Sequence, residues 1–321
     1  KQGYIMDRTA TISLVSYDPV VGDAPDRLAK TLEKMGMHIT QAAAQKTDLV
    51  VFPEICSYLG APDAWVFEEL DGPTITAMAA AARTHSVYVV IPQAIMEGDK
   101  RRNSSILIDR SGQVVGVYHK NVPTHTELDL GIIPGTETPV FETDFGRVAL
   151  TICFDINYWE VGHATCASCP ELVVWSSMWT GVRMMSRWAI EFGFYMAGVF
   201  AGGGSFIDPA GRPICSVPRR TSDETGMAPL ITAGLDLDLR VVHHDGNIQR
   251  VRSLFERHGP GAATAEHLGD ECLLTLRSHL PHMSTDELIA EFGIEPMRDY
   301  LARVRRDRQR ALDGTYPTSL H

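Results

Sequence analysis

Three side chains with complementary chemistry each end a short apolar run in this sequence. They are the carboxylate of Glu54, the ammonium of Lys120 and the thiol of Cys153. Each preceding run has the length and composition of a buried β-strand, and open α/β sheets place their chemistry at strand ends. If these strands deliver the three groups to one sheet edge, they supply a nucleophile, its base and a cation. The spacing therefore predicts covalent catalysis by Cys153.

The types of these groups suggest how such a site works. A free cysteine has a pKa near 8.5 and is only about 3% thiolate at pH 7. A neighbouring ammonium from Lys120 favours the thiolate, and Glu54 can accept the thiol proton and return it to a leaving group. Attack on an amide carbonyl creates an oxyanion, which Lys120 and the backbone N–H of Phe154 can stabilise. The expected intermediate is a thioester on Cys153.

Composition excludes several other classes of protein. The chain has 321 residues, 44% of them hydrophobic, and a formal net charge of -11. It can therefore bury a large core, and it lacks the basic surface that nucleic-acid binding needs. No apolar stretch approaches the roughly 18 residues needed to cross a membrane, and no signal peptide is evident. Six cysteines are too sparse for a disulfide scaffold, which favours reduced thiols and a cytoplasmic location.

Strand-like and helical patterns alternate without an obvious linker through most of the chain, which predicts one α/β domain over residues 1–250. Within it, residues 104–120 have the pattern of a β-hairpin. The character changes in residues 251–321, where helical periodicity covers 284–293 and 296–312. We expect this C-terminal helical extension to pack on the body of the protein or across an interface between subunits.

The order and context of the candidate residues resemble those of the nitrilase, or carbon–nitrogen hydrolase, superfamily. The matching segments, which carry that family's Glu, Lys and Cys in order, are Val51-Phe-Pro-Glu54, Tyr118-His-Lys120 and Thr151-Ile-Cys153-Phe-Asp155. Glu127, ahead of Pro134-Gly135, resembles the family's second glutamate. The likeness spans about residues 10–240 and is greatest to the amidase- and carbamoylase-like branch.

The resemblance implies a four-layer αββα sandwich, usually dimerised through helices near the cysteine strand. It implies hydrolysis or acyl transfer at a non-peptide C–N bond, with no metal and no organic cofactor. The expected partners are a small amide-type substrate and further copies of the chain, in a homodimer or higher homo-oligomer, with no nucleic acid and no membrane. In this family Glu127 would orient Lys120 or help to position substrate.

The residues after Cys153 bear on the substrate. Nitrile-cleaving members typically carry Trp and Glu there, whereas Phe154 and Asp155 follow here, which favours an amide or N-carbamoyl substrate. Asn157 and Trp159 stand where many amidase-like members have Arg and Pro, so the usual substrate contacts do not transfer. The candidate substrate-binding residues are Tyr58, His125, Phe154, Met178 and Trp179.

Other interpretations stay open from sequence alone. The same site would serve a nitrilase or an acyltransferase, and a catalytically idle binding or assembly module could retain the fold. A single cysteine that ends an apolar strand is usually a small buried hydrophobe. Cys166 and Cys169 form one Cys-x-x-Cys pair, without the second pair of ligands that a zinc site needs, and His243-His244-Asp245 is typical of a solvated loop.

Overall fold

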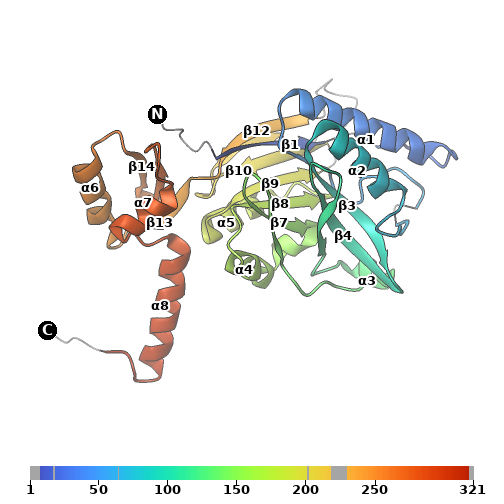
Figure 1. Ribbon diagram of the computed structural model, residues 1–321. Helices are drawn as coiled ribbons and strands as arrows, with labels where there is room; N and C mark the ends of the chain where they lie inside the picture. Colours follow the sequence, from blue (N-terminus) through green and yellow to red (C-terminus); the bar gives the residue numbers. More distant parts are fainter. Residues whose placement is uncertain (1–7, 17–18, 64, 201, 218–229, 318–321) are drawn as a thin grey trace. The chain divides into compact units, whose positions relative to one another are not determined.

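The fold is described from a computed structural model, which describes residues 8–16, 19–63, 65–200, 202–217 and 230–317. The chain divides into two compact units. One comprises Arg8–Leu237, and the other comprises Asp238–His321 together with Lys1–Asp7. Figure 1 shows both units, and each is treated below by itself. The candidate catalytic residues all belong to the unit Arg8–Leu237, here called the catalytic unit.

The first sheet of the catalytic unit has six strands in the order β12-β1-β2-β3-β4-β5. Their bounds are β1 Thr9–Val15, β2 Leu49–Val51, β3 Tyr88–Glu97, β4 Lys100–Ile108, β5 Val114–His119 and β12 Leu230–Asp236. Strands β1, β2 and β3 are parallel, whereas β4 and β5 pair antiparallel, with Ser105 opposite Tyr118. This pairing confirms the predicted hairpin, and Lys120 extends it because its N–H donates to the Asn103 carbonyl (2.8 Å).

The second sheet also has six strands, in the order β11-β10-β9-β8-β7-β6. Their bounds are β6 Val140–Glu142, β7 Arg147–Ile152, β8 Leu172–Ser177, β9 Tyr195–Phe200, β10 Gly203–Ile207 and β11 Pro213–Val217. Strands β7, β8 and β9 are parallel and almost wholly buried, as their continuous apolar runs predict. Cys153 therefore follows a strand of the second sheet, whereas Glu54 and Lys120 follow strands of the first.

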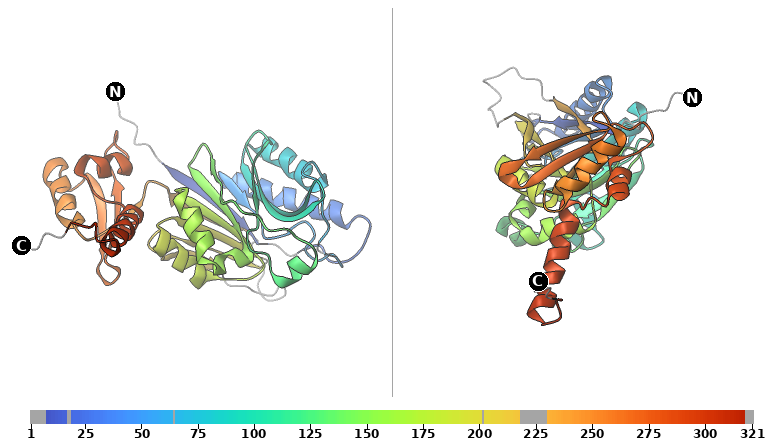
Figure 2. Two further views of the ribbon diagram at one scale, coloured as in Figure 1. Left: turned by 90° about the horizontal axis from the view of Figure 1, so that it is seen from below. Right: turned by 90° about the vertical axis from the view of Figure 1, so that its left-hand side faces the viewer.

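Helices cover the outer faces of both sheets, as the two views in Figure 2 show. On the first sheet lie α1 (Arg27–Ala44) and α2 (Pro73–His85), and the second sheet carries α4 (Trp159–Ala167) and α5 (Val182–Phe192). Met35 and Ile39 of α1 pack in one core cluster with the first sheet, and Met185 and Trp188 of α5 in another with the second. Burial of these apolar faces stabilises the packing. The four-layer αββα sandwich is thus confirmed.

The C-terminal unit differs from the predicted helical extension in two respects. Its first strand, β13 (Arg240–His243), pairs with β15 (Leu273–Ser278), which also pairs with β14 (Ala263–Leu268). The boundary therefore falls after Leu237, and the predicted boundary at residue 250 is too late. The prediction missed this sheet because β13 pairs with a strand some 30 residues further on, which leaves no local signal.

Helices complete the C-terminal unit. They are α6 Asn247–His258, α7 Thr285–Phe292 and α8 Met297–Leu312, and the latter two lie where helical periodicity predicts them. Leu254 of α6 and Leu288 of α7 pack against Leu276 of β15 in a single apolar cluster. In contrast, α8 buries none of its residues.

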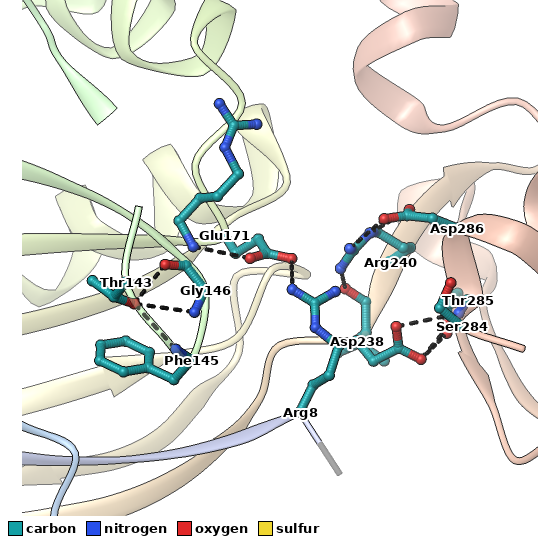
Figure 3. Close-up of polar contacts among 12 residues, drawn as sticks. Arg8, Thr143, Phe145, Gly146, Glu171, Asp238, Arg240, Ser284, Thr285 and Asp286 are labelled. Carbon is teal, nitrogen blue, oxygen red and sulfur yellow. Dashed lines mark hydrogen bonds and ion pairs between the residues drawn. The ribbon is translucent and has the colours of Figure 1, made fainter. Parts of the chain in front are cut away.

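Polar contacts fix local geometry within each unit, and Figure 3 shows several of them. In the catalytic unit, Glu171 accepts from the Arg8 guanidinium and from the Arg147 N–H (3.0 Å), which fixes the start of β7. In the C-terminal unit, Asp238 accepts from the N–H and the hydroxyl of Thr285, the latter at 2.7 Å, and so satisfies the first turn of α7.

Among the described ranges of the chain, no helix combines the length and the apolar character that crossing a bilayer requires.

Candidate active site

A buried lysine lies at the centre of the candidate site. The Lys120 ammonium is 1% exposed and donates to Glu54 Oε1 (2.9 Å) and to both carboxylate oxygens of Glu127 (2.8 and 3.0 Å). Burial by itself would lower the pKa of Lys120, but Glu54, Cys153 and Glu127 raise it above its ordinary value. The lysine is therefore a permanent cation at neutral pH, shared by two carboxylates.

The backbone around Lys120 is held on both sides. Its N–H bonds to Asn103 in β4, and its carbonyl accepts from the Gly135 N–H at 2.8 Å. A Cβ atom at Gly135 would lie 2.2 Å from the His119 carbonyl oxygen, so only glycine allows this approach. The Pro134-Gly135 segment noted in the sequence thus packs directly against the strand end that carries the lysine.

Glu127 is presented by a short capped helix. The Thr124 hydroxyl accepts from the Glu127 N–H (3.4 Å), and Glu127 Oε2 accepts from the Thr124 N–H (2.7 Å), which is a capping box at the start of α3 (His125–Asp129). Burial opposes ionisation of Glu127, yet Lys120 and these hydrogen bonds lower the pKa of its carboxyl. Glu127 is thus an ionised, 2% exposed partner of Lys120.

Asn103 is a site residue that the sequence did not reveal. Its side-chain amide donates to Glu54 Oε1 (2.8 Å) and to Glu127 Oε1 (2.7 Å), so one NH2 group bridges the two carboxylates. Asn103 lies on β4 opposite Lys120 and is 1% exposed. The only sequence signal was the run of polar residues Asn103-Ser-Ser105, which directly precedes the apolar end of the strand, Ile106-Leu-Ile108.

Replacing Asn103 with leucine should weaken both the fold and catalysis, because two buried carboxylates lose a donor. We expect the free energy of unfolding to fall by about 1–3 kcal/mol and turnover by about 10- to 100-fold. Ser105→Ala is the matched control, since Ser105 is buried two residues along the same strand. Denaturant titration and initial rates would compare the two, and equal effects of both variants would remove Asn103 from the site.

Cys153 occupies a strained turn directly after β7. Its φ of 42° lies in the left-handed region, which costs a non-glycine residue about 1–3 kcal/mol. It begins a short 3₁₀ turn, η1 (Cys153–Asn157), and its carbonyl accepts from the Trp175 indole at 3.0 Å. The Ser177 hydroxyl, at the end of β8, and the N–H of Met178, directly after it, act to lower the pKa of its thiol. Ser177, like Asn103, was not predicted as a site residue from the sequence.

The resting thiol differs from the sequence-based expectation. Burial and then the nearby Glu54 carboxylate raise the pKa of Cys153 to about 12, although Lys120, Met178 and Ser177 act to lower it. Lys120 therefore favours the thiolate, as expected, but burial and Glu54 outweigh its effect on the pKa of Cys153. The free site therefore holds a protonated thiol, so the proton must leave during attack rather than before it.

Direct titration can check the protonation state. With a pKa of about 12, Cys153 should show no thiolate ultraviolet absorbance between about pH 6 and pH 9. The measurement is the absorbance difference between the wild type and Cys153→Ala, which removes the contribution of the other thiols. A thiolate that titrates within that range would mean that Lys120 outweighs burial and Glu54.

The predicted substrate-binding residues fall into two groups. Met178 lies beside Cys153, directly after β8. Trp179 follows it, is 36% exposed and has its ring against that of Trp175. The Phe154 ring packs edge-on against Tyr158. The Tyr58 hydroxyl instead donates to buried Glu68 (3.0 Å), and His125 is exposed at the start of α3. Within the described residues, no hydrogen bond or ion pair joins Tyr58 or His125 to Cys153.

The alternative metal ligands do not form a cluster. In the ranges the structure describes, no group of three or more His, Cys, Asp or Glu side chains is placed to hold a metal ion. Cys166 and Cys169 donate to different carbonyls, those of Phe192 (3.6 Å) and Ala167 (3.8 Å). The ring of His243 stacks on Tyr300 in the C-terminal unit.

Solved structures with this fold include an amidase from Nesterenkonia sp. It is 19% identical, with a TM-score of 0.60, and covers 74% of this chain and 94% of its own. Nit3 of Saccharomyces cerevisiae, described as a member of branch 10 of the nitrilase superfamily, is 18% identical with a TM-score of 0.58, over 71% of this chain and 90% of its own. At these identities the likeness shows the fold alone.

The sequence relatives include both amidases and nitrilases. An (R)-stereoselective amidase from Pseudomonas sp. is 27% identical over 65% of this chain and 81% of its own length. An aliphatic nitrilase from Rhodococcus rhodochrous is 28% identical over 46% of this chain and 44% of its own. The chain thus spans only about half the length of several relatives it matches.

The comparison with protein families is broader. The model of the carbon–nitrogen hydrolase family matches residues 11–241, which include all of the catalytic candidates and nearly the whole catalytic unit. The resemblance seen in the Glu, Lys and Cys segments is therefore confirmed, and the chain belongs to the carbon–nitrogen hydrolase family.

Proposed function

We propose that this protein is a thiol amidohydrolase that cleaves the non-peptide C–N bond of a small amide or N-carbamoyl compound. The observation that carries the proposal is the buried Lys120 ammonium, bonded to Glu54 and Glu127 and within electrostatic reach of Cys153. A fully buried cation with two carboxylates is costly to maintain, and such arrangements are typical of functional sites. Beside a thiol on a strained turn, they suit nucleophilic catalysis.

In the proposed first half-reaction, Glu54 accepts the Cys153 proton as the sulfur attacks the substrate carbonyl carbon. The Lys120 ammonium and the Phe154 N–H stabilise the oxyanion that forms. As the C–N bond breaks, Glu54 returns the proton to the nitrogen, and ammonia or an amine leaves. The acyl group stays on Cys153 as a thioester.

In the second half-reaction, Glu54 accepts a proton from water as the water oxygen attacks the thioester carbonyl. The sulfur leaves and recovers its proton, which releases the acid and restores the protonated thiol. Glu127 keeps Lys120 charged and in place throughout, since it binds the same ammonium through both of its oxygens. We propose that Met178, beside the nucleophile, and Trp179, the next residue, border the substrate.

A nitrilase reaction is the second candidate, because the relatives include an aliphatic nitrilase. Ammonia release would be measured across aliphatic amides, N-carbamoyl amino acids and nitriles, with Cys153→Ala as the control. Release from amides or carbamoyl compounds that depends on Cys153 supports the proposal. Release from nitriles alone favours the nitrilase, and release that survives in Cys153→Ala would refute both reactions.

A further inference from the structure

Asp155 is a buried carboxylate that the proposed reaction does not use. It lies two residues after Cys153, in η1, and is 0% exposed. Its Oδ2 accepts from the Tyr118 hydroxyl (2.7 Å) and from the Ile152 N–H (3.0 Å), and its Oδ1 accepts from the Val122 N–H (2.8 Å). Both oxygens are thus engaged by donors of the protein itself.

These three donors lie at informative positions. Tyr118 and Val122 stand two residues before and two residues after Lys120, whereas Ile152 immediately precedes Cys153. Lys120 follows a strand of the first sheet and Cys153 a strand of the second. One carboxylate therefore bonds to the segment on either side of the lysine and to the strained turn of the nucleophile.

The chemistry of Asp155 indicates that stability alone does not explain it. Burial raises the pKa of its carboxyl from 3.8 to about 6, and the hydrogen bonds and Lys120 only partly oppose this. A raised pKa means that the group favours the folded state most at low pH and loses that contribution as pH rises through about 6. At neutral pH the ionised carboxylate is retained at a cost in stability.

We propose that Asp155 is the positioning residue that holds the Cys153 turn in place against the Lys120 segment, although the two follow strands of different sheets. This inference rests on the proposed function, since it concerns the same nucleophile and cation. It also revises the interpretation of Phe154-Asp155 as a mark of the substrate. Asp155 acts on the geometry of the site, because its oxygens are bonded to Tyr118, Ile152 and Val122.

The test compares Asp155→Asn with two other variants. Asparagine retains one acceptor oxygen but turns an NH2 group toward a backbone N–H, so at least one of the three bonds is lost. Tyr118→Phe removes the phenolic hydroxyl, which donates to Asp155 and also accepts from the Asn121 N–H (3.4 Å), and it serves if Asp155→Asn does not fold. Asp208→Asn is the matched control, because Asp208 is a buried aspartate of the same unit that accepts from the N–H groups of Ala210 and Arg212.

The primary measurement is the rate at which iodoacetamide alkylates Cys153, followed by peptide mass spectrometry and normalised to the folded fraction. We expect a fall of about 10- to 100-fold in Asp155→Asn, a smaller fall in Tyr118→Phe, and little change in Asp208→Asn. On any amide that the wild type hydrolyses, kcat should fall in the same order, with KM within about threefold. A merely structural role would lower the folded fraction and leave these normalised values unchanged.

The outcomes separate the two proposals. Wild-type protein that shows neither iodoacetamide labelling at Cys153 nor ammonia release from an amide that depends on Cys153 contradicts the proposed function. Wild-type labelling at Cys153, with folded Asp155→Asn and Tyr118→Phe labelled at the same rate, overturns the positioning role and leaves the proposed function standing. Equal losses in Asp208→Asn and Asp155→Asn would likewise overturn it.

Discussion

Cys153→Ala should lose at least about 10⁴-fold in turnover of any amide that the wild type hydrolyses. The two carboxylates that the structure places on Lys120, Glu54 and Glu127, are assigned to proton transfer and to holding the ammonium, so Cys153 alone carries the acyl group in the proposed reaction. The measurement is ammonia release at saturating substrate, at enzyme concentrations high enough to detect the residual rate. Substrate binding should persist, since the sulfur contributes little contact area.

Cys215→Ala is the control for the loss of a thiol as such. Cys215 lies in β11 at the edge of the second sheet and is also a free cysteine. Its replacement should leave the rate within about twofold of the wild type, as for surface substitutions away from special features. A Cys153→Ala protein that keeps even a tenth of wild-type turnover would mean that the thiol is a buried hydrophobe and not the nucleophile.

Lys120→Met should reduce both stability and activity. The substitution leaves Glu54 and Glu127 buried without a counter-charge, which typically costs about 3–5 kcal/mol. The pKa of Lys120 is raised from the ordinary 10.5, so its contribution to stability is fully present at neutral pH and is lost only as pH rises through the raised value. Loss of an oxyanion donor should also lower turnover by about 10²–10³-fold.

Two further variants make the stability result specific to the buried cluster. Adding Glu127→Gln to Lys120→Met removes one uncompensated charge, so the double variant should recover part of the lost free energy of unfolding. Lys30→Met breaks the exposed ion pair with Asp26 and should change that free energy by less than about 1 kcal/mol. Denaturant titration at neutral pH measures all three. A Lys120→Met protein as stable as Lys30→Met would contradict the charge cluster described here.

Much of the fold follows from local patterns in the sequence. Apolar runs that end at Glu54, Lys120 and Cys153 predict the strands, and the family resemblance carries the order of layers. The sequence did not show that the strands before Glu54 and Lys120 belong to one sheet, whereas the strand before Cys153 belongs to the other. The site therefore lies where ends of both sheets meet, not at the edge of a single sheet as expected.

The residues that support the site were harder to predict. Asn103 bonds to partners that are 24 and 49 residues away in the sequence. Asp155 bonds to Tyr118 and Val122, which are 37 and 33 residues away. Side-chain bonds across such separations leave no periodicity in the sequence. Tyr58 and His125 illustrate the same difficulty, because the structure shows Tyr58 bonded to Glu68 and His125 exposed, and residue type indicates neither. Their part in substrate binding stays a prediction.

The central claim is that Cys153 carries the acyl group between the two half-reactions. The most direct measurement is the mass of the peptide that contains Cys153, isolated after acid quench during steady turnover of an amide. This peptide should gain the mass of the acyl group of the substrate. An acyl group on any other residue would contradict this mechanism. So would a Cys153 peptide that stays unmodified during turnover, if added hydroxylamine also fails to trap the acyl group as a hydroxamate.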